Sequence, residues 1–178
     1  MGVNDQMVSN TIAISAGHHP GDSGAKYGIY TEYGEMIKWQ ALVIEYLSEY
    51  DIHVVIVPSR TLNEKIKYIN DLSPIYAIEL HLNGNIPNAS GCETLYYPGS
   101  ERGYLLGSYL QDAQVSSCGL RDRGIKERDD LGFLKYTNCP AVITETEFIS
   151  NYSTVASIRD CACKAIAEGI YKAYEDGV

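Results

Sequence analysis

Two histidines and two glutamates, His18, Glu32, His81 and Glu145, lie where segments with strand-like or helix-like patterns begin or end. Imidazole nitrogen and carboxylate oxygen are both good zinc ligands, and a catalytic zinc site combines three protein ligands with one open position for water. The fourth acidic residue would then handle the proton of that water. The helical motif HExxH is absent, so such a site has to be assembled from distant parts of the chain. The residues alone leave an alternative, in which His18 caps a loop and His81 is a hydrogen-bonded, partly buried histidine.

Short apolar, β-branched runs bounded by turn residues predict the strands that would position these groups. They occur at residues 11–15, 52–58 and 75–81, with weaker patterns at 92–97 and 140–145. Between them, apolar residues recur at a spacing near 3.6, which predicts helices. The helical segments are the stripe from Met36 to Leu47, the run after a Thr61–Glu64 capping box, the stripe from Leu106 to Ala113, and a C-terminal helix beginning near Ser153.

Strands that alternate with helices are typical of an α/β sheet covered on both faces. We therefore predict a single domain over residues 1–178, with its core at roughly 11–175. Its fold is expected to be a central mixed, mostly parallel sheet flanked by helices on both faces. Ligands of such sheets bind beyond the strand ends, where loops supply polar groups. His18, His81 and Glu145 follow or close three of the predicted strands, so we expect them at one edge of the sheet.

The composition excludes several classes of partner. The formal net charge of −9 argues against nucleic acid and against an anionic membrane surface, because both attract Lys- and Arg-rich proteins. No stretch approaches the roughly 20 apolar residues of a membrane span, so membrane insertion is not expected. The opening MGVNDQMVSN shows no signal peptide. Five cysteines without a framework spacing are expected to be reduced thiols, which predicts synthesis in the cytoplasm.

Five segments, in order along nearly the whole chain, resemble the zinc-dependent N-acetylmuramoyl-L-alanine amidases. AGHHPGDSGA is similar to the Gly-His that follows the first strand of that family and to the Asp-x-Gly-Ala shortly after it. TEY resembles the segment with its glutamate ligand, and ELHLNG the strand that ends in the second histidine. GCETLYYPGS is similar to the next strand, and CPAVITETEFISN resembles the segment that carries the catalytic glutamate.

The resemblance implies one zinc ion held by His18, Glu32 and His81, with Glu145 as the catalytic acid and base. The substrate it implies is peptidoglycan. The bond cut would be the amide between the lactyl group of N-acetylmuramic acid and the L-alanine of the stem peptide.

Three of these residues have a neighbour of the same type, namely His19, Glu35 and Glu147. The family pattern favours the first residue of each pair, because it places the ligand directly after a glycine, the acidic ligand ahead of the helix stripe, and the catalytic carboxylate directly after the apolar run. Glu147 is expected to line the cleft or to raise the pKa of Glu145 by like-charge repulsion. Asn83 either orients substrate or satisfies a loop.

Family members of this kind act as phage endolysins, as bacterial autolysins and as sporulation amidases. With neither a signal peptide nor a wall-binding domain visible, we expect a phage or prophage endolysin that is synthesised in the cytoplasm and reaches the cell wall after release, by a holin or by lysis. The alternatives are a bacterial autolysin or sporulation amidase, a zinc peptidase of similar fold, and a non-catalytic wall-binding module. The sequence does not identify a protein partner.

Overall fold

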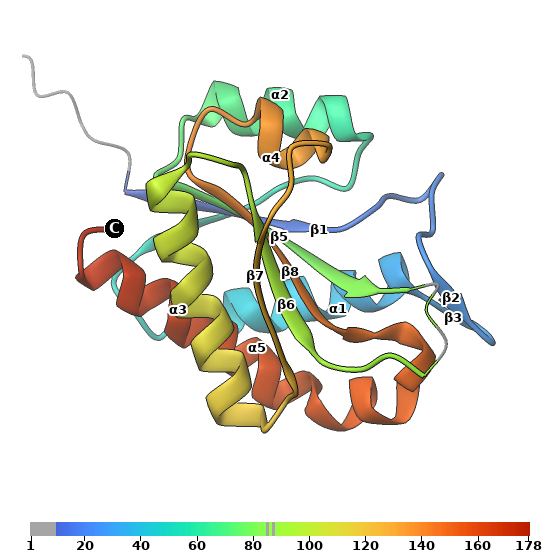
Figure 1. Ribbon diagram of the computed structural model, residues 1–178. Helices are drawn as coiled ribbons and strands as arrows, with labels where there is room; N and C mark the ends of the chain where they lie inside the picture. Colours follow the sequence, from blue (N-terminus) through green and yellow to red (C-terminus); the bar gives the residue numbers. More distant parts are fainter. Residues whose placement is uncertain (1–9, 85, 87) are drawn as a thin grey trace, which may run out of the picture.

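A computed structural model describes residues 10–84, 86 and 88–178. Within this part of the chain, a six-stranded sheet runs through the centre in the order β4-β1-β5-β8-β6-β7 (Figure 1). β1, β4, β5 and β8 are parallel, β6 is antiparallel to β8, and β7 is parallel to β6. The strands are β1 (Thr11–Ala16), β4 (His53–Ile56), β5 (Tyr76–Asn83), β6 (Cys92–Tyr96), β7 (Asp122–Glu127) and β8 (Ala141–Phe148), and a small hairpin is formed by β2 (Lys26–Tyr27) and β3 (Tyr30–Thr31).

Helices cover both faces of the sheet. α1, α3 and α5 lie on one face, and α2 and the short α4 lie on the other (Figure 1). The helices are α1 (Glu32–Leu47), α2 (Leu62–Leu72), α3 (Glu101–Cys118), α4 (Gly132–Tyr136) and α5 (Tyr152–Glu175), with a 3-10 turn η1 (Ile149–Asn151) before α5. The predicted α/β architecture, with a mixed and mostly parallel sheet between helices, is thus confirmed.

Local sequence explains where two helices that border the site begin. Thr31 is the N-cap of α1, and its hydroxyl accepts a hydrogen bond from the amide of Gly34 at 3.1 Å. Thr61 and Glu64 form the predicted capping box at the start of α2. The apolar stripe of each helix then packs on the sheet, so these caps fix which residue of each helix stands at its amino end.

The sheet face under α2 and α4 changes character along its strands. Because successive residues of a strand point to opposite faces, Ala77, Glu79 and His81 of β5 share one face. Ala77 of β5 and Ile143 of β8 belong to the same apolar cluster as Phe133 of α4. Farther along the same strands this face carries polar side chains, and the register sets His81 beside Glu145. On this one face, the strands are therefore apolar near Ala77 and Ile143 and polar near His81 and Glu145.

All five predicted strands are present with shifted limits, whereas β7, α4 and the β2–β3 hairpin are not among the predicted elements. The most consequential shift is in β8, which continues to Phe148. Glu145 therefore lies inside a strand rather than at its end, because pairing with β5 and β6 extends past the apolar run.

The expectation that all five cysteines are reduced is wrong for two of them. Cys118, the last residue of α3, forms a disulfide with Cys161 of α5, with the Cα atoms 6.0 Å apart. The two residues are 43 positions apart in sequence, and only the packing of α3 against α5 brings them together. Cys92, Cys139 and Cys163 are free thiols.

Among the helices of the described residues, none combines the length and the apolar composition that a membrane span requires. The prediction about a signal peptide concerns the first ten residues, of which residues 1–9 lie outside the described part of the chain.

Candidate metal centre and catalytic cleft

His18 lies in the loop that follows β1, in a backbone conformation unusual for its residue type. Its φ is 62°, in the left-handed region that side chains with a Cβ rarely adopt. The residue before it, Gly17, has no room for a side chain, because a Cβ there would lie 2.6 Å from the ring of His81. The amide of Gly17 donates to the carbonyl of Leu80 at 2.8 Å, which joins the start of this loop to β5. The loop thus aims the His18 ring at the end of β5.

Glu32 is the first residue of α1, and its carboxylate is buried. Two backbone amides hold it, with Ala25 donating to Oε2 at 3.0 Å and Leu82 to Oε1 at 3.1 Å. Burial by itself would raise the pKa of Glu32, but hydrogen bonds from His18 and His81 outweigh it and lower the pKa below its ordinary value. The carboxylate is therefore ionised and ready to bind a cation.

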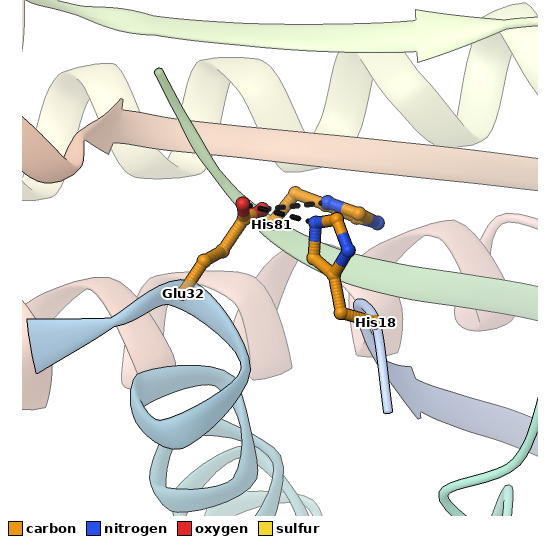
Figure 2. A group of neighbouring side chains, drawn as sticks. All are labelled: His18, Glu32 and His81. Atoms are coloured by element: carbon orange, nitrogen blue, oxygen red, sulfur yellow. Dashed lines mark hydrogen bonds and ion pairs between the residues drawn. The ribbon is translucent and has the colours of Figure 1, made fainter. Parts of the chain in front are cut away.

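The side chains of His18, Glu32 and His81 converge on one point from a loop, a helix and a strand (Figure 2). Nε2 of His18 lies 3.0 Å from Oε2 of Glu32, and Nδ1 of His81 lies 2.7 Å from Oε1. One ligand atom from each residue can be chosen so that all three lie within 4.8 Å of one another. Two imidazole nitrogens and one carboxylate oxygen at this spacing are a donor set that can hold a divalent cation such as zinc.

Glu145 lies next to this group without belonging to it. It lines the same cleft as the three residues, and its Oε2 atom is buried with no hydrogen-bond partner among the described residues. Burial raises the pKa of Glu145 to about 7, His81 opposes that rise, and Glu32 and Glu93 add to it. A carboxyl group with this pKa can both accept and release a proton near neutral pH.

Each histidine is also held from behind by a carboxylate. Nδ1 of His18 lies 3.1 Å from Oδ2 of Asp22, whose other oxygen accepts from the amide of Gly24 at 3.1 Å. The sequence indicated that Asp22 shapes its loop, but not that it contacts His18. Nε2 of His81 lies 3.3 Å from Oε2 of Glu79, a contact the sequence analysis missed. Its signal was the spacing, because residues two apart on a strand share a face.

Asn83 and Glu147, which the sequence suggested for the cleft, lie in different places. Asn83 lines the cleft, and its Nδ2 donates to Glu93 at 2.8 Å while its Oδ1 accepts from the amide of Gly84. Glu147 is buried, and its carboxylate accepts from the amides of Gly91 and Phe148. Glu147 thus points toward the loop before β6, where the amide of Gly91 donates to its carboxylate, and it is not among the residues that line the cleft.

The alternatives to the predicted ligands lie outside the cluster. His19 takes part in the turn of its own loop, where its Nδ1 accepts from the amide of Gly21 at 3.1 Å. Glu35 is buried and binds Lys38 and Arg159, each at 2.7 Å. The geometry therefore brings together His18, Glu32, His81 and Glu145, the four residues from which the sequence analysis started.

Residues 12–176 match the model of a protein family described as N-acetylmuramoyl-L-alanine amidase. The protein YqiI of Bacillus subtilis (strain 168), described as uncharacterized, is 31% identical over 93% of this chain and 85% of its own length. The endolysin of Bacillus phage SPP1 is 29% identical over 91% of this chain and 64% of the endolysin. The amidase LytC of Bacillus subtilis is 27% identical, and the match covers 94% of this chain but only 36% of LytC.

Solved structures agree in fold. An N-acetylmuramoyl-L-alanine amidase from Clostridium difficile 630 superposes with a TM-score of 0.87 at 25% identity, covering 96% of this chain and all of the other. The catalytic domain of CwlV, an N-acetylmuramoyl-L-alanine amidase from Bacillus (Paenibacillus) polymyxa, gives a TM-score of 0.83 at 25% identity, over 93% and 98% of the two chains.

Proposed function

Because this chain belongs to the N-acetylmuramoyl-L-alanine amidase family, we propose that it hydrolyses the amide between N-acetylmuramic acid and the L-alanine of the peptidoglycan stem peptide, with one zinc ion held by His18, Glu32 and His81. The observation that carries this proposal is the juxtaposition of two groups in one cleft. Three ligand atoms lie within 4.8 Å of one another, and beside them is a buried carboxylate oxygen that has no hydrogen-bond partner in the described part of the chain.

Zinc fits this set of residues better than magnesium or calcium does. Those two cations prefer shells made of oxygen atoms, whereas two of the three donors here are imidazole nitrogens. Three protein ligands also leave a fourth position open, as in catalytic zinc sites. Carboxylates behind both histidines, from Asp22 and Glu79, complete the arrangement usual for zinc-bound imidazole.

The chemistry assigned to the chain itself rests on Glu145. When bound, zinc supplies a Lewis acid that polarises the scissile carbonyl and activates a water molecule. Oε2 of Glu145 accepts a proton from the attacking water and then delivers it to the nitrogen of the leaving amine. Since that nitrogen leaves poorly without a proton, and since the pKa of Glu145 is about 7, one group can perform both transfers.

The cleft also supplies groups that could hold the substrate. Its volume of about 660 Å³ falls in the usual range of ligand sites. Lys26, Asn83 and Gly84 lie along it with the metal ligands. We propose that Asn83 contacts the substrate from the end of β5, while its bond to Glu93 fixes the orientation of its amide.

The test is digestion of purified peptidoglycan by the zinc-loaded protein and by Glu145→Gln, with mass spectrometry of the products. The wild type is expected to release stem peptides with a free L-alanine amino terminus. Glu145→Gln is expected to lose activity by about 10²-fold or more, because proton transfer is removed while zinc stays bound. Glu35→Gln is the control, since Glu35 is another buried glutamate, and its ion pairs with Lys38 and Arg159 lie outside the cluster.

Three results would overturn the proposal. Equal rates for wild type and Glu145→Gln would exclude the catalytic role, and loss of zinc from Glu145→Gln would show that the division of roles is wrong. Release of peptide fragments that do not begin at L-alanine would indicate a zinc peptidase instead.

For the biological role we propose lysis of a bacterial host as a phage endolysin, supported by the similarity to the endolysin of phage SPP1. The similarity to LytC supports the second candidate, a bacterial autolysin. Co-expression with a holin in a Bacillus host separates them. An endolysin is expected to lyse cells only when the holin opens the membrane, whereas lysis without a holin would favour the autolysin.

A further inference from the structure

Three buried polar side chains lie behind His81, on the side away from Glu32. Glu79 is 4% exposed and Lys65 of α2 is 2% exposed. Nζ of Lys65 lies 2.9 Å from Oε1 of Glu79, and the hydroxyl of Ser15 donates to the same oxygen at 3.0 Å. Lys65 also donates to the carbonyl of Ala16, the last residue of β1. These hydrogen bonds therefore link α2, β1 and β5 next to His81.

The contacts of Glu79 are divided between its two oxygens. Oε1 accepts from Lys65 and Ser15, and Oε2 is left for Nε2 of His81 at 3.3 Å. A buried ion pair contributes little net stability compared with apolar residues of similar size, because desolvating the two charges offsets their attraction. Stability alone is therefore a poor reason for a lysine and a glutamate at this depth. Their contact with a metal ligand is a better one.

An imidazole has only two nitrogens, so a partner for one of them determines what the other can do. When Nε2 of His81 carries the proton and donates it to Glu79, Nδ1 is left with a free lone pair. Nδ1 is the atom that lies 2.7 Å from Glu32, on the side of the proposed metal. The buried carboxylate thus selects both the orientation of the ring and the tautomer that can bind a cation.

We propose that Glu79, fixed by Lys65 and Ser15, is a positioning residue that holds His81 as a metal ligand through Nδ1. This inference rests on the zinc site of the proposed function and adds to it a role for residues that do not touch the metal. Glu79 acts by accepting a hydrogen bond, and Lys65 acts by holding Glu79 in place and balancing its charge.

The first test is the zinc affinity of folded variants, measured by competition with a chromophoric chelator. Glu79→Leu combined with Lys65→Met removes both charges, conserves the approximate volume and leaves Nε2 of His81 without an acceptor. We expect zinc affinity to fall about 10- to 100-fold. Glu79→Gln keeps an acceptor oxygen and is expected to lose less. The matched control is Glu35→Gln, another buried ion-paired glutamate, whose zinc affinity should stay within about twofold of the wild type.

The second test needs no variant. In the zinc-loaded wild type, a long-range ¹⁵N–¹H NMR spectrum is expected to show a proton on Nε2 of His81 and none on Nδ1. A proton on Nδ1 would overturn the inference, whether or not the variants fold.

The outcomes also separate this inference from the proposed function. A wild type that binds no zinc overturns both. A wild type that binds zinc, together with a folded Glu79→Leu/Lys65→Met variant that binds within twofold of it, overturns only the role of Glu79.

Discussion

His18 and His81 face the same carboxylate from two regions of different construction. The loop half of the site, residues 17–25, presents His18 from an irregular segment with a left-handed backbone. The strand half, formed by β5 and β8, presents His81 and Glu145 from paired strands. The side chain of Asp22, behind His18, is 61% exposed, whereas the side chain of Glu79, behind His81, is buried.

The difference shows two ways to fix a ligand. In the loop half, the backbone conformation mainly sets the orientation of His18, and the exposed Asp22 adds a contact that solvent screens. Glycines are required there, since a Cβ on Gly24 would lie within 2.6 Å of both His18 and Glu32. In the strand half, regular hydrogen bonding fixes the backbone, and a buried network fixes the ring. We therefore expect the two halves to respond differently to substitution and to pH.

The largest expected effect is the loss of a ligand. His18→Gly and His81→Ala should each weaken zinc binding by more than about 100-fold, because each variant keeps only two of the three protein ligands. The metal-free forms of the two variants should differ in stability. His81→Ala leaves Glu32 and Glu79 without a shared partner, whereas His18→Gly relieves the left-handed backbone of a strain of about 1–3 kcal/mol. Urea unfolding should show His81→Ala to be less stable by at least about 1 kcal/mol.

Equal stabilities of these two metal-free variants would remove the distinction between the halves. Zinc affinity close to that of the wild type in either variant would show that the assigned ligand is wrong.

The second expected effect is a pH dependence of stability that comes from Glu145 in the strand half. The pKa of Glu145 is raised from 4.5 to about 7 in the folded protein, so folding favours its protonated form. Its contribution to stability is thus complete below pH 4.5 and is lost as the pH rises to about 7. Metal-free Glu145→Gln does not lose this stability. Between pH 4.5 and 8, its free energy of unfolding should therefore rise by about 2–3 kcal/mol relative to that of the wild type.

The measurement is urea unfolding of both proteins across that pH range, with Glu35→Gln as the control. A difference in stability between wild type and Glu145→Gln that does not change with pH would contradict the burial of a protonatable carboxyl at this position.

The smallest expected effect is that of Asp22→Asn in the loop half. The asparagine keeps an oxygen for the amide of Gly24 but loses the charge beside His18. Because that carboxylate is exposed and screened, zinc affinity should fall by less than about 10-fold, and the change should shrink at high salt. Chelator competition at two ionic strengths tests this. A greater loss than in the Glu79→Leu/Lys65→Met variant would reverse the order of the two halves.

Much of this molecule could be predicted from the sequence because its signals are local. The capping box at Thr61 and Glu64 lies within four residues, and the strand before His18 is one apolar run. The disulfide of Cys118 and Cys161 could not be predicted, since neither the spacing of the cysteines nor the pattern of the two helices shows that those helix ends meet. Glu147 shares a strand with Glu145, yet a loop 56 residues away in sequence takes its carboxylate.

The sequence by itself determined the order of strands and helices, the family, and the types of residue available for binding a cation, because periodicity, caps and short motifs are written in neighbouring residues. Only the tertiary structure decided that Glu145 has a buried oxygen with no partner among residues 10–84, 86 and 88–178, that Glu79 and Lys65 lie behind His81, and which nitrogen of each histidine faces Glu32. The physical reason is that burial, ring orientation and pKa depend on groups brought together by strand pairing and helix packing, and those contacts join residues far apart in the chain.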